Sequence, residues 1–339
     1  MPEEPLVETP ALVLDLDIVE RNISAMQEHA NAHGVALRPH IKTHKLPQLA
    51  HLQLAAGAVG ITCQKLGEAE VFARAGCDDI LITFPIVGQH KLERLAALAR
   101  GRRVVGVCDS AVVAAGLVAH GIDALVECDT GMGRTGVQSP EQALAVARSL
   151  GDRFAGLMTY PTPEGGGWLP AARALIESAG LAVPIVSGGG SHASAGDLSS
   201  QPITETRPGV YVFNDRMCLA SGSELASCAA RVHATVVSRP TPTRVILDAG
   251  SKALAADRPP GIDGHGLIVE HPDAVIVRLT EEHGMVELPE GYRGLTIGQV
   301  VQVVPNHICP VVNLYDAVTV SRGGVPLERW AVAARGRSS

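Results

Sequence analysis

A cluster of basic residues directly follows a short apolar run near the start of the chain. The run 35–37 (Val-Ala-Leu) is followed by Arg38, His40, Lys42 and Lys45. Such an arrangement is typical of a buried strand that delivers polar side chains to the mouth of a parallel barrel. Desolvation at such a mouth lowers the pKa of an amine, which makes Lys42 a candidate Schiff-base nucleophile. An isolated lysine would instead favour a solvated turn with ordinary charges.

A serine and three glycines follow a second apolar run, residues 183–186. Ser187, Gly188, Gly189 and Gly190 come near the end of the seventh predicted strand–helix unit. Barrel enzymes often bind phosphate with backbone amides after strands seven and eight, and glycine lets the backbone approach the anion closely. These four residues are therefore candidates for a phosphate site, and a flexible surface turn is the alternative.

A histidine and a cysteine stand two positions apart near the C-terminus. His307 and Cys309 follow the apolar run 300–304. Alternate residues of an extended segment face the same side, so imidazole and thiolate can converge on one ion. This pair favours zinc, with manganese or magnesium as alternatives, and it leaves positions open for water and substrate. Ordinary packing would explain a lone pair of this kind equally well.

The elements that must position these residues follow from alternating patterns along the chain. Helical stretches such as 91–99, 141–150 and 170–179 separate most of eight short apolar runs. The pattern predicts a parallel (β/α)8, TIM-like barrel, with an open doubly wound sheet as the alternative. The eight runs are 35–41, 59–63, 80–84, 104–107, 124–128, 155–160, 183–187 and 209–213.

The pattern changes after about residue 227, where closely spaced β-like runs alternate with Gly and Pro turns. These runs are 232–238, 244–248, 274–279 and 299–304. We therefore predict a barrel domain at 17–225 and a mainly-β domain at 226–339. The first strand, 11–16, precedes the barrel, so residues 1–16 are assigned to the β domain.

Composition restricts the class of protein. The 339-residue chain carries a formal net charge of −7, which gives no general attraction to nucleic acid or to acidic membranes. Its seven scattered cysteines do not form a disulfide-scaffold pattern, so we expect a reducing, cytoplasmic location. Residues 1–10 lack the features of a secretory signal, and no apolar segment reaches the roughly 20 residues of a membrane helix.

Six ordered segments carry a resemblance that covers most of the chain. The chain resembles the D-threonine aldolase and D-serine dehydratase family, fold-type III pyridoxal-phosphate enzymes related to alanine racemase. In such families the first strand pairs with the C-terminal domain. The segments are 38–45, 67–70 (Gly-Glu-Ala-Glu), 129–134 (Asp-Thr-Gly-Met-Gly-Arg), 187–190, 207–209 (Arg-Pro-Gly) and 305–309 (Pro-Asn-His-Ile-Cys).

The resemblance implies roles for individual residues. Lys42 matches the lysine that holds pyridoxal 5'-phosphate, and Arg134 matches an arginine that approaches the phenolic oxygen of the cofactor. Tyr160 is expected near the pyridine ring and Tyr211 near the phosphate, although packing explains each tyrosine about as well. Asp129 could equally cap the turn that follows it. The segment with His307 and Cys309 resembles the divalent-metal segment of the family.

The resemblance also implies a reaction. We expect a lyase that acts on D-3-hydroxy amino acids such as D-serine or D-threonine, releasing a 2-oxo acid and ammonia. Retro-aldol cleavage to glycine and an aldehyde is the alternative. Family dehydratases resemble this chain in having cysteine as the second metal residue, whereas well-known D-threonine aldolases carry aspartate, so Cys309 favours dehydration.

Two other hypotheses remain open, together with the oligomeric state. A racemase would need a second acid–base group, for which Tyr292 or Tyr315 could be proposed, and a non-catalytic cofactor carrier would need none. Relatives form dimers, so we expect a homodimer whose ligand is a small D-β-hydroxy amino acid.

Overall fold

The computed structural model describes residues 7–160, 167–191, 196–198 and 202–339. The chain divides into two compact units. One, here called the barrel unit, comprises Ser24–Lys42, Pro47–Gly209 and Gly336–Ser339. The other, here called the β unit, comprises Met1–Ile23, Thr43–Leu46 and Val210–Arg335. The chain first passes from the β unit into the barrel unit within helix α1, Leu16–Ala32.

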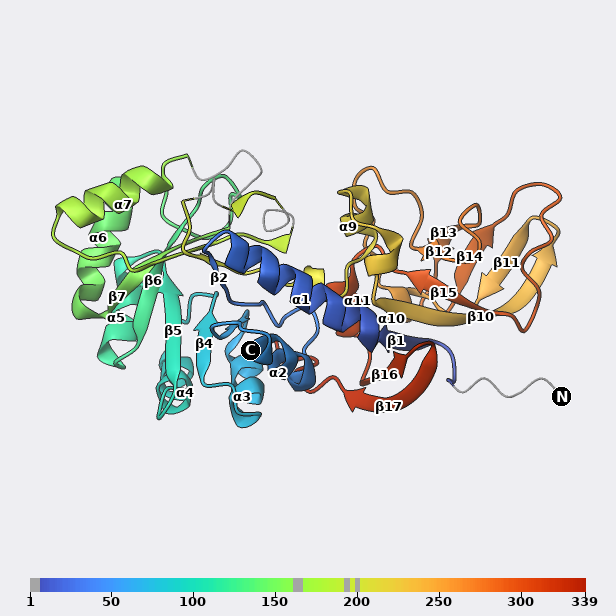
Figure 1. Cartoon of the computed structure of the whole chain (residues 1–339), viewed down its shortest axis with the longest axis horizontal. Helices are drawn as coiled ribbons and strands as arrows, with labels where there is room; N and C mark the ends of the chain where they lie inside the picture. Colours follow the sequence, from blue (N-terminus) through green and yellow to red (C-terminus); the bar gives the residue numbers. More distant parts are fainter. Residues whose placement is uncertain (1–6, 161–166, 192–195, 199–201) are drawn as a thin grey trace. The chain divides into compact units, whose positions relative to one another are not determined.

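The barrel unit is built on a curled, eight-stranded parallel sheet (Figure 1). Its strand order is β2-β9-β8-β7-β6-β5-β4-β3. An isolated parallel bridge between His40 and Thr62 joins the segment after β2 to β3, the last strand in that order. The strands are β2 Ala36–Leu37, β3 Ile61–Cys63, β4 Asp79–Ile82, β5 Arg103–Cys108, β6 Asp123–Cys128, β7 Phe154–Thr159, β8 Ile185–Gly188 and β9 Glu205–Thr206.

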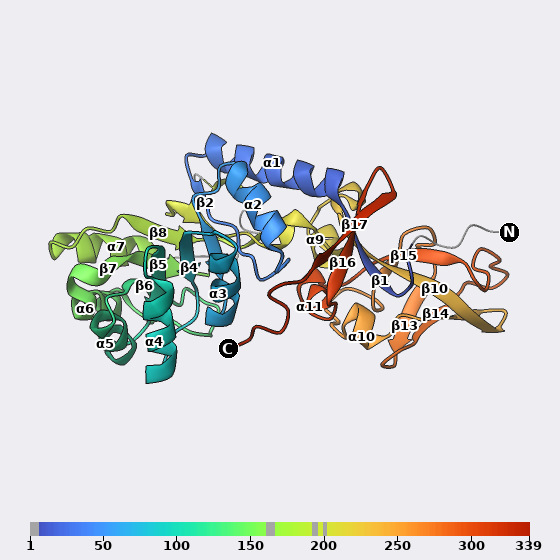
Figure 2. The same cartoon turned by 90° about the horizontal axis from the view of Figure 1, so that it is seen from below.

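Helices alternate with these strands and lie outside the sheet (Figure 2). Ser110 and Ser139 cap α5 and α6, and each accepts a hydrogen bond from a backbone amide three residues later. Strand side chains on the inner face, among them Leu81, Val107 and Met158, form a buried aliphatic core. The helices are α2 Pro47–Ala55, α3 Leu66–Arg74, α4 Gln89–Leu98, α5 Ala111–Ala119, α6 Pro140–Leu150 and α7 Leu169–Ser178.

The β unit contains a nine-stranded sheet of order β11-β14-β13-β12-β15-β10-β1-β16-β17. Strand β1 pairs antiparallel with β10 and parallel with β16, which confirms the expected pairing of the first strand with the C-terminal region. The strands are β1 Ala11–Asp15, β10 Ala230–Thr241, β11 Arg244–Leu247, β12 Leu267–Ile268, β13 Val275–Leu279, β14 Gly284–Glu287, β15 Val300–Val304, β16 Ala317–Arg322 and β17 Val325–Ala331. Short helices of this unit are α9 Arg216–Ala220, α10 Ser251–Leu254 and α11 Ile308–Val312.

The predicted fold class is confirmed, with a TIM-like parallel barrel sheet and a C-terminal mainly-β region. One predicted strand is wrong. Residues 209–213 do not form the eighth strand, because the carbonyl of Val210 accepts hydrogen bonds from the amides of Phe213 (3.0 Å) and Asn214 (2.7 Å) and closes a 3-10 turn. Glu205–Thr206, which carries no apolar side chain, supplies the eighth strand instead.

Within the described residues, no helix has the length and apolar character required to cross a membrane. All seven cysteines are free thiols, and Cys309 alone among them is not fully buried.

Candidate functional site

The predicted cofactor residues of the barrel unit follow the carboxyl ends of four parallel strands. Lys42 comes after β2, Arg134 after β6 and Tyr160 directly after β7. Residues 187–190, here called the glycine loop, begin in the last two residues of β8 and continue beyond its end. Every neighbouring pair of strands in this sheet is parallel, so these ends meet at one edge. The fold therefore brings the four segments to the same edge of the sheet.

Backbone and imidazole contacts fix the segment that carries the lysine. The His40 amide donates to the Pro208 carbonyl at 2.9 Å, and the Ile41 amide donates to the Thr62 carbonyl at 2.9 Å. The amide of Lys42 donates to Nδ1 of His40 at 3.4 Å, and Nε2 of His40 lies 3.1 Å from Oε1 of Gln64. A neutral His40 protonated on Nε2 satisfies both contacts. The backbone that leads to half-buried Lys42 is thus held by the carbonyl of Pro208 on one side and by that of Thr62 on the other.

The loop that leads to Arg134 is held by Asp129. Its Oδ1 accepts hydrogen bonds from the amides of Gly131 (3.0 Å) and Gly133 (3.1 Å), and its Oδ2 accepts one from Gln138 (3.3 Å). Burial opposes ionisation of Asp129, but these hydrogen bonds outweigh it and lower the pKa of the carboxyl below its usual value. These contacts support the turn-capping role considered for Asp129.

Arg134, Tyr160 and Gly190 converge. The guanidinium carbon of Arg134 lies 5.4 Å from the centroid of the Tyr160 ring, within cation–π range. A Cβ atom added to Gly190 would come within 3.0 Å of Cε2 of Tyr160. The side chain of Arg134 is 48% exposed, so its charge remains accessible beside the ring. Two of the predicted cofactor residues, Arg134 and Gly190, thus lie beside a third, Tyr160.

A buried glutamate that the sequence interpretation did not include lies next to Arg134. Oε1 of Glu127 accepts a hydrogen bond from the Thr135 hydroxyl at 2.8 Å and lies 3.9 Å from Nη2 of Arg134. Oε2 is buried without a hydrogen-bond partner in the described part of the chain. Burial raises the pKa of the Glu127 carboxyl above its usual value. The only sequence signal that could have identified Glu127 is the presence of a carboxylate within the otherwise apolar strand β6.

The glycine loop has the backbone conformation of an anion cradle. Gly189 has a φ of 77°, and a Cβ atom at Gly188 would lie 2.5 Å from Cγ2 of Ile203. The amides of Gly189 and Gly190 donate no hydrogen bond to another described residue, so they are available to an anion. This backbone fits a phosphate group, as expected for the cofactor.

Ser187 contributes to this loop in another way. Its hydroxyl is fully buried, donates to Oε1 of Glu205 at 2.6 Å and accepts from Nη1 of Arg207 at 2.6 Å. Because the hydroxyl has both a donor and an acceptor partner inside the protein, backbone amides rather than this side chain are the phosphate donors that the geometry offers.

Tyr211 belongs to the β unit and lies in a 3-10 turn, Val210–Val212, rather than at the end of a strand. Its side chain is buried, with 5% of its surface exposed. Its expected contact with the cofactor phosphate stays a prediction.

The segment with His307 and Cys309 differs from the extended geometry on which the metal prediction was based. His307 is the N-cap of α11, with extended backbone angles, and Cys309 lies in the first turn of that helix. The Cys309 thiol donates to the hydroxyl of Thr43 at 3.3 Å, and Thr43 follows Lys42 in the chain. In the described ranges no third His, Cys, Asp or Glu completes a metal cluster with the pair. Imidazole and thiol are ligand types that a divalent metal with water and substrate as further ligands uses, so the metal site at this pair stays a prediction.

Buried polar side chains hold this segment. Oδ2 of Asp215 accepts from the Ile308 amide at 3.0 Å, while its Oδ1 accepts from the Cys218 amide at 3.1 Å and caps α9. Asn306 donates to the carbonyls of Asp257 and Gly264, at 2.9 Å each. The residues on either side of His307 are therefore fixed by the fold.

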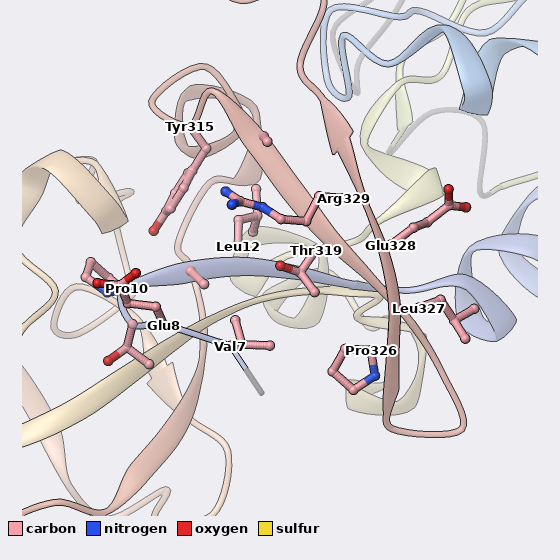
Figure 3. A pocket seen from close by; sticks show the side chains of 13 residues that line it. Val7, Glu8, Pro10, Leu12, Tyr315, Thr319, Pro326, Leu327, Glu328 and Arg329 are labelled. Carbon is pink, nitrogen blue, oxygen red and sulfur yellow. The ribbon is translucent and has the colours of Figure 1, made fainter. Parts of the chain in front are cut away.

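The two tyrosines proposed for a racemase are engaged elsewhere in the β unit. The hydroxyl of Tyr292 lies 2.5 Å from Nδ1 of His271. The hydroxyl of Tyr315 donates to the Ala253 carbonyl at 3.2 Å, and burial raises the pKa of this phenol above its usual value. Tyr315, Thr319 and Arg329 line a pocket of about 510 Å³ (Figure 3), to which none of the predicted cofactor or metal residues contributes. Neither tyrosine has the contacts of an acid–base group in a cofactor site.

Comparisons with known proteins agree with these observations. The alanine racemase N-terminal domain family matches residues 14–217, and the putative serine dehydratase domain family matches residues 229–321. The D-threonine aldolase of an Arthrobacter species is 39% identical over 99% of this chain and 96% of its own length.

Two solved structures extend the similarity to the whole fold. The D-threonine aldolase from Filomicrobium marinum has a TM-score of 0.90 at 34% identity, covering 98% of this chain and 97% of its own. A cysteine-to-alanine variant of a D-threo-3-hydroxyaspartate dehydratase, solved in a metal-free form, has a TM-score of 0.87 at 30% identity and covers 96% and 97%. This chain therefore belongs to the D-threonine aldolase and D-serine dehydratase family of pyridoxal-phosphate lyases, whose fold is that of alanine racemase.

Proposed function

We propose that this protein is a pyridoxal-phosphate- and divalent-metal-dependent lyase that removes water from D-3-hydroxy amino acids, giving a 2-oxo acid and ammonia. The observation that carries the proposal is the gathering of Lys42, Arg134, Tyr160 and the glycine loop at one edge of the parallel sheet. This edge, at the carboxyl ends of the strands, is where barrel enzymes hold their substrates.

The residues of this edge suit distinct parts of the cofactor. Lys42 would hold it covalently, Arg134 would stabilise its phenolate oxygen, and the amides of Gly189 and Gly190 would bind its phosphate. Tyr160, a neutral phenol, would lie near the pyridine nitrogen. When bound, the cofactor supplies an electron sink for charge that develops at Cα, and the metal supplies a Lewis acid for the β-oxygen.

The chain's own residues then carry the proton transfers. Nζ of Lys42 would remove the Cα proton, and the β-hydroxyl would leave as water. The resulting 2-amino-2-enoic acid would tautomerise to an imine, and one water would hydrolyse its C=N bond to release ammonia and the 2-oxo acid, so D-threonine yields 2-oxobutyrate. His307 and Cys309 would hold the metal, for which we propose zinc because a thiolate–imidazole pair suits it better than magnesium.

Retro-aldol cleavage is the second candidate, since a D-threonine aldolase is 39% identical to this chain over nearly its full length. In this reaction a base removes the β-hydroxyl proton and the Cα–Cβ bond breaks, so D-threonine gives glycine and acetaldehyde. Cys309 favours dehydration, because family dehydratases carry cysteine at this position. A metal-free cysteine variant of a related dehydratase accords with such a role for a cysteine.

A product assay separates the two reactions. The protein, loaded with pyridoxal phosphate and zinc, is incubated with D-threonine, and the products are resolved by mass spectrometry beside a chelator-treated sample. Metal-dependent formation of 2-oxobutyrate and ammonia supports dehydration. Glycine and acetaldehyde would instead identify an aldolase. If no D-3-hydroxy amino acid gave either set of products, the lyase assignment would be overturned.

The covalent role of Lys42 has a separate test. Borohydride reduction of the loaded protein followed by peptide mass spectrometry should place the cofactor on Lys42. Lys42→Ala should lose the label and lower kcat by about a thousandfold or more. Lys91→Ala, at an exposed position of α4, should change neither. A label on another lysine in the unsubstituted protein would refute the assignment.

A further inference from the structure

Arg207 is a buried arginine at the base of the glycine loop. Its Nη1 donates to the Ser187 hydroxyl at 2.6 Å and its Nη2 to the Thr159 carbonyl at 2.8 Å. Its backbone amide donates to the Gly188 carbonyl at 3.1 Å. Burial lowers the pKa of Arg207 to about 10, so the guanidinium is still charged at neutral pH.

Ser187 connects this charge to a second buried one. Its hydroxyl accepts from Arg207 and donates to Oε1 of Glu205, at 2.6 Å in each case. Oε2 of Glu205 in turn accepts from Nε of Arg38 at 2.7 Å. Arg38 then donates to Asp79 at 2.6 Å. The hydroxyl of Ser187 therefore has a single orientation, fixed on one side by a cation and on the other by a carboxylate.

Arg207 contacts the segments at the ends of β7 and β8 directly, and Thr159 connects it to the loop after β6. Thr159 immediately precedes Tyr160, and Ser187 begins the glycine loop. The hydroxyl of Thr159 also lies 2.8 Å from the hydroxyl of Thr130, in the loop that leads to Arg134. One guanidinium thus joins the ends of β7 and β8 and, through Thr159, the loop after β6.

Burying the charged guanidinium of Arg207 costs free energy of desolvation. The desolvation penalty of a buried ion often exceeds its electrostatic gain, so an apolar side chain of similar volume would stabilise the fold as well or better. In the described part of the chain Arg207 has no carboxylate within 4.0 Å and its two side-chain contacts are neutral oxygens, so Glu205 and Glu127 compensate its charge only from a longer distance. Stability alone is therefore a poor explanation for this arginine.

We propose that Arg207 is a positioning residue that acts through Ser187 to set the geometry of the glycine loop for the cofactor phosphate. This inference rests on the proposed function, since it assumes that the loop binds the phosphate of pyridoxal phosphate. The role of Ser187 is then to transmit the position of Arg207 to Gly188, Gly189 and Gly190, and its hydroxyl does not contact the phosphate.

The test compares Arg207→Met, Arg207→Lys, Ser187→Ala and the double variant Arg207→Met/Ser187→Ala. The readouts are the Kd for pyridoxal phosphate, the ³¹P chemical shift of the bound phosphate and the thermal midpoint of the cofactor-free protein. Arg153→Met, which removes an exposed ion pair with Asp123 in the same unit, is the matched control.

We expect Arg207→Met and Ser187→Ala each to weaken binding by roughly tenfold and to move the ³¹P resonance, and the double variant to bind about as tightly as Arg207→Met. Arg207→Lys should resemble Arg207→Met, because an ammonium cannot reach both Ser187 and Thr159 in the fork geometry of a guanidinium. The control should match the unsubstituted protein in the Kd for pyridoxal phosphate and in the ³¹P shift.

Three results would overturn the inference. Folded Arg207 variants with unchanged Kd and ³¹P shift would remove any positioning role, and additive losses in the double variant would show that Arg207 does not act through Ser187. A lowered thermal midpoint with an unchanged ³¹P shift would assign Arg207 to stability alone. If Arg207→Met does not fold, Arg207→Lys and Ser187→Ala decide between the same results. A failure of the unsubstituted protein to bind pyridoxal phosphate would instead refute the proposed function.

Discussion

Among the seven cysteines, Cys309 is the half-buried one, and the other six are buried. Burial raises the pKa of Cys108 and of Cys128 to about 12, so both thiols stay protonated at pH 8. We therefore expect iodoacetamide at pH 8 to modify Cys309 before any other cysteine. Bound zinc should slow this modification, because a metal-bound thiolate is shielded. Peptide mass spectrometry over a time course measures both effects.

The matched control for this labelling is Cys309→Ser, which should abolish the fast phase and leave the slow modification of the other cysteines unchanged. Fast labelling of a buried cysteine such as Cys218 would contradict the burial argument. Protection by zinc that persists in His307→Ala would contradict the shared metal site.

Glu127 makes the free energy of unfolding depend on pH. Its pKa is raised in the folded state by burial, so between the ordinary glutamate pKa and the raised one the folded protein holds a proton that the unfolded chain has lost. Stability from this residue is therefore present at low pH and is lost as the pH rises through that window. As the pH rises through this range, the free energy of unfolding of the unsubstituted protein should fall relative to that of Glu127→Gln. The fall should be about 1 kcal/mol or more for each unit by which the pKa is raised.

Urea denaturation of the cofactor-free protein at several pH values from 4.5 to 8 measures this difference. Glu93→Gln, at an exposed position of α4, is the control and should follow the unsubstituted protein. A difference between the Glu127→Gln and unsubstituted proteins that is constant over the whole range would show that burial does not raise this pKa.

Sequence motifs gave roles to Lys42 and Arg134, whereas Arg207 was included only in the segment 207–209 without a role, and Glu205 was not identified. Glu205 lies 18 positions from Ser187 and Arg207 lies 20 positions from it, so their contacts depend on the pairing of β8 with β9. In sequence, Glu205 and Arg207 have the composition of a solvated loop. Their burial follows only from the closure of the sheet, which single-residue patterns do not contain.

At the level of elements, the glycine loop and Tyr160 restrict each other. A Cβ atom at Gly190 would lie 3.0 Å from Cε2 and 3.1 Å from the hydroxyl of Tyr160. We expect Gly190→Ala to displace the ring or the loop and to weaken the binding of pyridoxal phosphate by roughly tenfold, an effect of about 1.4 kcal/mol. Absorbance titration with the cofactor measures this change.

Gly167→Ala is the matched control, because a Cβ atom at Gly167 meets no atom of the described residues within 4 Å. This variant should bind the cofactor as the unsubstituted protein does. Removing the ring as well, in Gly190→Ala/Tyr160→Ala, should make the added methyl group harmless, so that the double variant binds like Tyr160→Ala. An additive loss would indicate that the methyl group disturbs the loop by another route.

The sequence predicted a strand of the parallel sheet correctly where the strand is rich in apolar residues. The apolar runs from 59–63 to 183–187 each contain or overlap a strand of the sheet, because inner strands of a parallel sheet are buried on both faces. The eighth run instead forms a 3-10 turn, and the true eighth strand, Glu205–Thr206, is polar. Cys309 is helical for a related reason, since the five-residue helix α11 is too short to produce a periodic pattern.

At the scale of the whole molecule, the barrel and β units are each assembled from separate stretches of chain. Thr43–Leu46 belongs to the β unit although residues on both sides of it belong to the barrel unit. The predicted division, a barrel at 17–225 and a β domain at 226–339 together with residues 1–16, does not include this exchange. The contact of Thr43 with Cys309 was equally beyond sequence reasoning, because 266 positions separate the two residues.

The outer strand of the β unit leads to a prediction about assembly. Strand β17 is at the edge of the nine-stranded sheet, and its Val325 and Leu327 are 59% and 57% exposed (Figure 3 labels Leu327). An edge strand with exposed apolar side chains favours association, so we expect a homodimer with a mass about twice 35.3 kDa by light scattering. Leu327→Lys should raise the dissociation constant of this dimer by roughly tenfold or more, whereas Val112→Lys, at a 79% exposed position of α5, should not. A monomeric mass at all concentrations would refute the dimer, and an unchanged dissociation constant in Leu327→Lys would exclude β17 from the interface.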